Sequence, residues 1–355
     1  MDSIKANDSI IHFNNKCYTS LNKHIKENNF SKIFILVDEN THQYCLPRFL
    51  ERLETDIVIE IIEIESGEIN KTIDTCAGVW NTLSDLDADR KSLVINIGGG
   101  VITDLGGFVA CTFKRGIAYI NVPTTLLSMV DASVGGKTGV DLGHLKNQIG
   151  VISNPNLVLI DTQFLNTLPK NQMKSGLAEM LKHGLISDKN YWNKFNSLSE
   201  LTLNDLDELI YESVLIKKHV VEVDPFEHGL RKTLNFGHTI GHAIESYFLS
   251  NETKTTLLHG EAIVIGMILA SYISTELAGL SIDERDTIKE LLINYYGKIT
   301  IEKSDLKPII ELLKYDKKNN HGNINFVLLE SIGKTKIDCL VTDEIILEAF
   351  DYYAS

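Results

Sequence analysis

The chain has 355 residues and a formal net charge of −14, with charged and hydrophobic fractions typical of a globular protein. This length allows two domains with full cores. The acidic balance argues against nucleic acid or an anionic membrane as the main partner, although a local basic pocket can still bind a small anionic substrate. The N-terminus lacks a signal-peptide pattern, and we expect no stretch that approaches the roughly 18 apolar residues of a spanning helix. The five cysteines show no ligand spacing, which predicts reduced, mostly buried thiols in a cytoplasmic protein.

The first 165 residues alternate short apolar runs with helical patterns. Runs rich in Ile and Val predict buried strands at Lys32–Val37, Ile57–Ile64, Leu93–Ile97, Ile117–Val122 and Leu157–Ile160. Between them, residues 71–84 and 101–111 have the spacing of helices. This alternation predicts an α/β domain with a mostly parallel, Rossmann-like sheet.

The pattern changes after Pro169. Long amphipathic patterns predict helices over 173–186, 204–221, 231–248, 258–279 and 283–296. Only Asn325–Leu329 has the pattern of a strand, and the polar stretch 250–257 predicts a surface loop. We therefore predict an α/β domain over 1–168 and a mainly helical domain over 169–355.

A glycine-rich segment, GGGVITDLGGF, spans residues 98–108 directly after a predicted strand. Three glycines permit a tight turn or close approach of a ligand, and the following helix would offer its first N–H groups to a phosphate. Asp104 would lie in the first turn of that helix. The dinucleotide fingerprint fails at Thr103, so a simple tight turn and a phosphate site are equally consistent with this segment alone.

The ends of neighbouring strands favour a ligand site. Asp38 and Asn40 follow one predicted strand, and Thr124 and Thr125 follow another. Ligands of open α/β sheets bind at the carboxyl ends of the strands. Asp38 could accept hydrogen bonds from ribose hydroxyls, and the threonines could donate to phosphate or amide groups.

Histidines and carboxylates gather on three predicted helices. His238 and His242 are four residues apart and share a helix face, while Glu179 and His259 lie on two other apolar helices. Gly237 and Gly241 within the first helix predict close approach of another backbone or a ligand. Buried charges such as Glu179 need partners, which suggests one shared cation. Two imidazoles and a carboxylate are typical of a catalytic zinc site, but spacing alone leaves open whether His238 or His242 is the ligand.

Several cations occur around these helices, and some of them stand beside glycine or asparagine, as in GGKTG, KNQIG and GLRKTLN. They are Arg115, Lys137, Lys146, Lys182, Lys217, Arg231, Lys317 and Lys318. Taken singly, each is expected to be a solvated surface charge. A cation cluster beside a metal in an acidic protein instead indicates a polyanionic small substrate.

These motifs together resemble the 3-dehydroquinate synthase family along almost the whole chain. The resemblance is carried by SGEINKT (66–72), GGGVITDLGGFVA (98–110), FKRG (113–116), VPTTLLSMVDASVGGKTGVD (122–141), KNQIG (146–150), SGLAEMLKHG (175–184), GLRKTLNFGHTIGHAIE (229–245), LHGEA (258–262) and DKKN (316–319). Leu145 and Pro225 depart from the family pattern, and both bear only on local loop shape.

The resemblance implies conversion of 3-deoxy-D-arabino-heptulosonate 7-phosphate to 3-dehydroquinate and phosphate in the shikimate route. It implies catalytic NAD and a divalent metal, zinc or cobalt, bound by Glu179, His238 and His259. His242 and Glu227 would transfer protons, with Lys182 and Lys137 as further catalytic groups. The implied NAD contacts are Asp38, Asn40, Glu68, Lys71, Gly99, Gly100, Val101, Asp104, Thr124, Thr125, Lys137, Lys146, Phe164, Leu165, Asn166 and Thr167.

The resemblance also implies a substrate site and a partner. The implied substrate contacts are Arg115, Asp131, Lys137, Lys146, Asn147, Lys182, Lys217, Arg231, Asn235, His242 and one of Lys317 and Lys318. Arg115 would reach the phosphate from the partner subunit of a homodimer.

Three other functions compete with this interpretation. Another sugar phosphate cyclase, such as a 2-deoxy-scyllo-inosose or valiolone-type synthase, would share the fold, NAD and metal. Arg231 with Lys217 suits a substrate carboxylate, which those substrates lack. A metal-dependent alcohol dehydrogenase of the glycerol dehydrogenase type would turn over NAD, but its metal site usually includes an aspartate. A non-catalytic metal-stabilised protein would have no need of the cation cluster.

Overall fold

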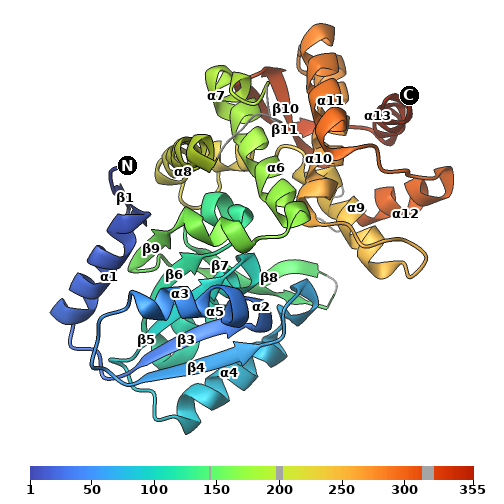
Figure 1. Cartoon of the computed structure of the whole chain (residues 1–355). Helices are drawn as coiled ribbons and strands as arrows, with labels where there is room; N and C mark the ends of the chain where they lie inside the picture. The colour runs from blue at the N-terminus through green and yellow to red at the C-terminus, as the bar shows by residue number, and fades with distance from the viewer. Residues whose placement is uncertain (144, 197–202, 314–323) are drawn as a thin grey trace. The chain divides into compact units, whose positions relative to one another are not determined.

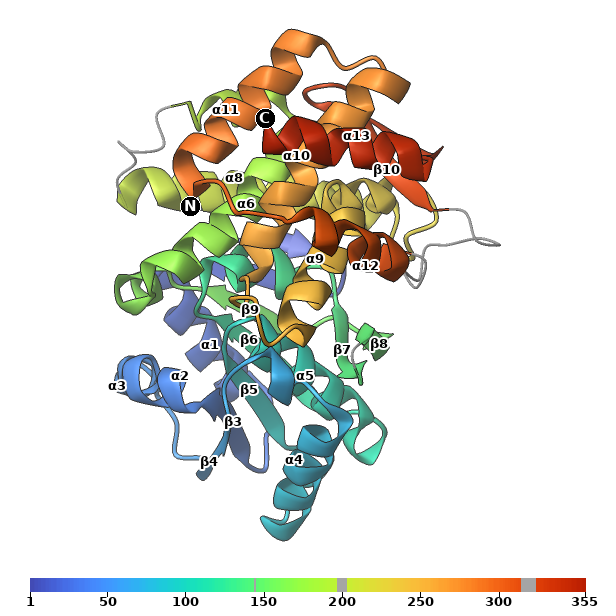
Figure 2. The ribbon, with the colours of Figure 1, turned by 90° about the vertical axis from the view of Figure 1, so that its right-hand side faces the viewer.

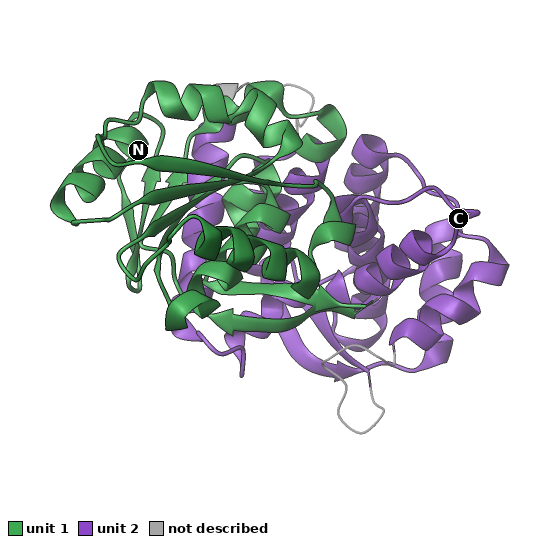
Figure 3. Ribbon diagram, turned by 90° about the horizontal axis from the view of Figure 1, so that it is seen from below, with its two compact units in different colours: residues 1–173 green, residues 174–355 purple. Residues whose placement is uncertain are grey.

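The computed structural model describes residues 1–143, 145–196, 203–313 and 324–355. These residues form two compact units, 1–173 and 174–355, coloured separately in Figure 3.

Unit 1 is built on a seven-stranded sheet (Figure 1). Its order is β1-β2-β9-β6-β5-β3-β4, and every neighbouring pair except β1 and β2 is parallel. The strands span Ile4–Ala6 (β1), Ser9–Phe13 (β2), Ile33–Asp38 (β3), Ile59–Ile64 (β4), Leu93–Gly98 (β5), Ala118–Pro123 (β6) and Leu157–Ile160 (β9). All five predicted strands are confirmed to within two residues, and the mostly parallel α/β fold is confirmed.

Both faces of the central strands are buried. Phe34 and Leu36 of β3 belong to one core cluster with Val79 of α4 (Ile73–Asp85) and Leu105 of α5 (Gly100–Thr112). Ile35, on the opposite face of β3, is also fully buried. Burial on both faces explains why these strands are continuous apolar runs. Because α5 begins at Gly100, Asp104 lies in its second turn, and the prediction of the first turn was wrong.

Several elements of unit 1 were missed from the sequence. They are β1, β2, the helices Asn15–Glu27 (α1), Glu39–Tyr44 (α2) and Leu46–Glu51 (α3), and the antiparallel hairpin of Lys137–Leu142 (β7) and Leu145–Ile152 (β8). The hairpin was missed because it is partly exposed and contains glycine. Gly139 faces Gly150, and a Cβ on either would lie 2.4 or 2.3 Å from a backbone oxygen of the other strand.

Unit 2 is mainly helical, as predicted. Its helices are Lys170–Ser187 (α6, which begins in unit 1), Lys189–Asn193 (α7), Leu203–Val223 (α8), His238–Ser250 (α9), His259–Leu277 (α10), Ile282–Tyr296 (α11), Lys303–Leu313 (α12) and Asp343–Ala354 (α13). The single helix predicted over 231–248 was wrong, because a 3₁₀ turn over Leu230–Asn235 (η6) precedes α9. Gly237 lies between them at φ 77°, so it is the residue before the helix and not a helix-interior glycine.

An antiparallel hairpin completes unit 2. Strand β10 (Asn325–Ser331) contains the predicted run, but β11 (Lys334–Leu340) was missed. The burial of β11 alternates between exposed and intermediate, and no residue of it is fully buried. A strand without a buried apolar face lacks the signal from which strands are predicted.

Helix α10 packs against α9, α11, α13 and β10 (Figure 2). Its length and mean hydropathy of 1.3 would suffice to span a membrane, so the expectation that no stretch approaches a span was wrong. However, 72% of the apolar 18-residue stretch of α10 is buried inside the structure, as in the core helix of a folded unit. The five cysteines are free thiols, three of them buried, as predicted.

Candidate active site

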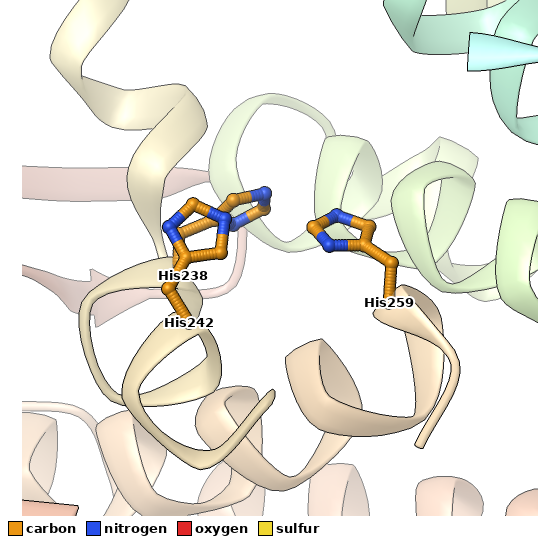
Figure 4. Close-up of side chains that lie close together, drawn as sticks. All are labelled: His238, His242 and His259. Atoms are coloured by element: carbon orange, nitrogen blue, oxygen red, sulfur yellow. The ribbon is translucent and has the colours of Figure 1, made fainter. Parts of the chain in front are cut away.

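Three histidines of unit 2 converge on one point (Figure 4). His238 and His242 come from the first turns of α9, and His259 is the first residue of α10. One ring nitrogen of each lies within 4.8 Å of the others. Residues 251–258 connect the two helices and include most of the loop predicted over 250–257. His238 and His259 are the first residues of α9 and α10, so the two helices present their N-terminal ends to the same point.

Glu179 of α6 completes the cluster. Its side chain is fully buried, and Oε1 lies 3.4 Å from His238 Nε2 and 3.6 Å from His259 Nε2. The other oxygen, Oε2, accepts a hydrogen bond from Lys182 Nζ. Oε1 has no hydrogen-bond partner of good geometry. A buried carboxylate oxygen that faces two imidazole nitrogens in this way fits a divalent cation between the three groups.

The two imidazoles nearest Glu179 are oriented through their other nitrogen. His238 Nδ1 lies 3.2 Å from the carbonyl oxygen of Phe236, and His259 Nδ1 lies 3.3 Å from Glu245 Oε2. An acceptor at Nδ1 keeps the proton there and leaves the lone pair on Nε2. When both rings are neutral, as metal binding requires, both lone pairs are on the nitrogens that face Glu179.

The charges of the cluster are set by burial and by each other. Burial disfavours the carboxylate, but Lys182 and His238 outweigh it and hold the pKa of Glu179 well below its usual range. Burial and the Lys182 ammonium lower the pKa of His238. Burial also opposes protonation of His259, but the Glu245 and Glu179 carboxylates outweigh it and raise its pKa to about 10. In the metal-free protein at neutral pH, Glu179 is therefore ionised, His238 is neutral and His259 is protonated.

Metal binding should consequently release a proton. We expect metal-free protein to release about one proton per Co²⁺ near pH 7.5, because His259 must give up its proton to bind the ion. The affinity of the protein for Co²⁺ should fall by about tenfold for each unit by which the pH is lowered near neutrality. Calorimetric titration in two buffers of different ionisation enthalpy measures the proton count. Binding without proton release would contradict a role for His259 as a ligand.

His242 lies beside the same point. Its ring centroid is 5.1 Å from that of His238 and 5.7 Å from that of His259. The geometry therefore offers two possible donor sets, the three histidines or Glu179 with His238 and His259. The Glu179 Oε1 atom makes no hydrogen bond and lies between the two oriented imidazoles, which favours the second set.

A tight loop after α8 carries two further predicted residues. The Asp224 carboxylate accepts hydrogen bonds from the backbone N–H groups of His228 (3.0 Å), Gly229 (2.7 Å) and Arg231 (3.0 Å). Within this loop Glu227 has φ 62° and accepts a hydrogen bond from Asn235 Nδ2 at 2.6 Å. The structure thus brings Glu227 and Asn235 together on the segment that leads into α9.

The predicted substrate cations of unit 2 are mostly buried. Lys182, Lys217 and Arg231 are 1%, 6% and 3% exposed, which excludes the expectation of solvated surface charges for these three. Arg231 Nη1 donates to the carbonyl oxygen of Pro225 at 2.7 Å. Lys317 and Lys318 lie outside the described residues.

In unit 1 the predicted nucleotide residues lie at the carboxyl end of the sheet. The parallel strands run β4-β3-β5-β6-β9, so the order reverses between β3 and β5. Asp38 ends β3, and the Gly98–Gly100 turn follows β5, on either side of this point. Doubly wound sheets bind ligands at such a reversal. Helix α5 has no side-chain cap at Gly99, so its first N–H groups suit a phosphate.

Local packing also explains why glycines occupy the turn after β5 and why an aspartate ends β3. A Cβ on Gly98 would lie 2.4 Å from Ile102 Cβ, and one on Gly99 would lie 3.0 Å from Thr125 Cγ2. Asp38 Oδ1 accepts from the backbone N–H of Thr41 at 2.7 Å and caps α2. The glycines thus serve a tight turn, and the Asp38 carboxylate is held by a cap.

Lys71 connects predicted NAD residues with predicted substrate residues. Its buried Nζ donates to Asp104 Oδ2 at 2.6 Å and to Asn147 Oδ1 at 2.7 Å. Lys146 Nζ lies 3.5 Å from Glu68 Oε1. Burial outweighs the Lys71 ammonium and raises the pKa of Asp104 to about 6. The β7–β8 hairpin is thereby joined to the N-terminal side of α4.

The remaining predicted residues of unit 1 are spread over several elements. Thr124 is buried after β6, and Asn40 is exposed on α2. The 3₁₀ turn Thr162–Thr167 buries Phe164 and Leu165 and exposes the other two residues predicted from it. The other positions are Val101 on α5, Asp131 on the π-helical turn Ser128–Ala132, Lys137 at the start of β7 and exposed Arg115 at φ 70°.

Two residues of the site were missed from the sequence. Glu245 shares the α9 stripe of His238 and His242, seven and three residues after them, and this spacing was a usable signal. Asp224 stands in an Asp-Pro pair five residues before a glycine, which is a turn signal. Neither was assigned a role because nothing local in the sequence shows their partners.

Models of one protein family match most of the chain. A profile of the 3-dehydroquinate synthase N-terminal domain matches residues 61–175, and one of the C-terminal domain matches residues 176–319. The 3-dehydroquinate synthase of Parabacteroides distasonis is 43% identical over 326 residues, covering 91% of this chain and 92% of the relative. That of Clostridium botulinum is 43% identical over 308 residues, covering 86% and 87%.

Solved structures show the same fold over the full length. A 2-deoxy-scyllo-inosose synthase in complex with carbaglucose-6-phosphate, NAD⁺ and Co²⁺ has a TM-score of 0.87 at 26% identity, covering 99% of each chain. An iron-containing alcohol dehydrogenase has a TM-score of 0.68 at 15% identity, covering 99% of each chain, which shows the fold alone.

Proposed function

The chain belongs to the 3-dehydroquinate synthase family, and we propose that it converts 3-deoxy-D-arabino-heptulosonate 7-phosphate to 3-dehydroquinate and phosphate. This is an NAD- and metal-dependent lyase reaction of the shikimate route to aromatic amino acids. The carrying observation is the cluster in which the buried Glu179 Oε1 faces the Nε2 atoms of His238 and His259. Relatives at 43% identity support the dehydroquinate product over that of another cyclase, and buried Arg231 and Lys217 suit the substrate carboxylate.

In this proposal Glu179, His238 and His259 hold a divalent ion, zinc or cobalt. The bound ion would supply a Lewis acid that eases proton loss from a substrate hydroxyl. Lys182, paired with Glu179, keeps the carboxylate ionised for binding. The solved cyclase with Co²⁺ and NAD⁺ supports this combination of cofactors.

Unit 1 supplies the nucleotide site around Asp38, the Gly98–Gly100 turn and the threonines after β6. NAD bound there would accept one hydride from the substrate and return it, so that a ketone exists while phosphate leaves. The uncapped start of α5 binds the pyrophosphate, and the Lys71–Asp104 pair anchors the adjoining hairpin. Lys146 and Asn147 of that hairpin bind substrate.

Proton transfers fall to His242 and Glu227. His242 brings a ring nitrogen to the cluster, and Asn235 orients the Glu227 carboxylate. Lys182, Lys217, Arg231 and Lys137 bind the substrate anions, which holds the reacting atoms in the geometry for ring closure.

We also place the enzyme in the cytoplasm as a homodimer. Arg115, exposed in a turn at φ 70°, would reach the phosphate in the partner's active site. The free thiols suit a reducing compartment. Sedimentation equilibrium tests the dimer, and a monomer at micromolar concentration would exclude it.

Purified protein should release phosphate from the heptulosonate phosphate with no net accumulation of NADH. A phosphate-release assay run with simultaneous absorbance at 340 nm measures both, and a chelator should stop the reaction. Steady NADH formation would indicate an alcohol dehydrogenase. Release from a hexose phosphate but not from the heptulosonate phosphate would indicate a different cyclase.

A further inference from the structure

Glu245 is a buried carboxylate of α9 with no assigned role. It is 7% exposed, and its Oε2 lies 3.3 Å from Nδ1 of His259, fourteen residues further along the chain on α10. A buried ionised group is stable only with charged or hydrogen-bonding partners, so this contact is part of what keeps Glu245 in place.

We propose that Glu245 is a positioning residue that fixes the tautomer and ring orientation of His259 for metal binding. The inference rests on the proposed function only in that the cluster binds a divalent cation. A carboxylate that accepts the Nδ1 proton leaves the lone pair on Nε2, which lies 3.6 Å from Glu179 Oε1. It also makes the imidazole a more basic ligand.

The two imidazoles of the cluster are oriented by different means. His238 uses a backbone carbonyl, that of Phe236, which no substitution removes. His259 uses the Glu245 side chain, so its orientation can be altered by mutation. His259 is also the first residue of α10, so helix backbone follows it but only a loop precedes it. Control of its ring therefore depends more on a side-chain partner.

The contact between α9 and α10 does not rest on Glu245. A Cβ on Gly266 of α10 would lie 1.9 Å from the carbonyl oxygen of Gly237, and one on Gly241 would lie 2.8 Å from Ile263 Cδ1. Backbone packing this close fixes the helix pair through many atoms. Variants of Glu245 should therefore fold and change the ring orientation of His259.

The test is Co²⁺ titration of the metal-free full-length protein and of Glu245→Gln and Glu245→Ala. Loss of Glu245 also removes the charge that holds the competing proton on His259, so affinities are compared after extrapolation to the fully deprotonated ligand. On that basis Glu245→Ala should bind about 10- to 100-fold more weakly. Glu245→Gln should lose less, because its amide oxygen still accepts the Nδ1 proton without the negative charge. Both should shift the visible absorption of bound Co²⁺. Glu290→Gln, an exposed acid-to-amide change on α11, should bind as the wild type does.

The outcomes separate this inference from the proposed function. A wild type that binds no stoichiometric Co²⁺ would overturn the metal site itself. A wild type that binds Co²⁺, with Glu245→Ala and Glu245→Gln equal to it in affinity and spectrum, would overturn only the positioning role. If the alanine variant does not fold, the near-isosteric glutamine variant decides: unchanged affinity and spectrum would reject the role, and a weakened, shifted signal would support it.

Discussion

Replacing His259 with alanine should abolish stoichiometric metal binding, whereas replacing His242 with alanine should leave the metal bound and reduce turnover. His259 presents Nε2 to Glu179 Oε1, and Glu245 holds its ring, so replacing His259 removes one of three ligands. His242 is proposed to move protons, which is worth about 10²- to 10⁴-fold in rate. Metal content after dialysis and the rate of phosphate release measure the two effects.

An exposed histidine provides the control for this pair of variants. His219 lies on the exposed side of α8, and His219→Ala should retain both metal and turnover. Equal loss of metal in the His242 and His259 variants would show that the three histidines form the donor set. The i, i+4 spacing of His238 and His242 permits that arrangement, so the experiment decides between two sets that both satisfy the geometry.

The parts of the fold that could be predicted are those with a strong hydrophobic pattern. Strands β3, β5 and β9 are apolar runs because both faces of the sheet are covered, and their bounds follow from the sequence. The β7–β8 hairpin has no such run, because it consists of half-exposed residues and a pair of facing glycines. Helix α1 did carry a signal, because Cys17, Leu21 and Ile25 are spaced four apart.

The candidate site was predictable in its residues but not in its geometry. Sequence spacing brought Glu179, His238, His242 and His259 into consideration, because each is a polar residue on an apolar helix. The choice of nitrogen on each ring depends on partners that are distant in sequence or part of the backbone, such as Glu245 for His259. Those partners exist only once α9 and α10 are packed together.

The substitution Gly266→Ala should disrupt the packing of α9 against α10. A Cβ at this position would lie 1.9 Å from the carbonyl oxygen of Gly237 and 2.9 Å from the backbone nitrogen of Gly241. Both atoms belong to the first residues of α9 and the residue before it, so no side-chain rotation relieves the overlap. We expect a loss of about 3 kcal/mol or more in the free energy of unfolding. Urea denaturation of the metal-free protein measures it.

The same substitution should also weaken metal binding. Gly237 immediately precedes His238, so a shift of this backbone away from α10 separates His238 from His259. Gly78→Ala is the matched control, because that glycine lies in the exposed face of α4 with no atom within 4 Å of the added Cβ. It should gain about 0.5–1 kcal/mol from helix propensity and bind Co²⁺ normally. A Gly266→Ala protein with wild-type stability and affinity would show that the close contact of the two helices does not hold the metal ligands in place.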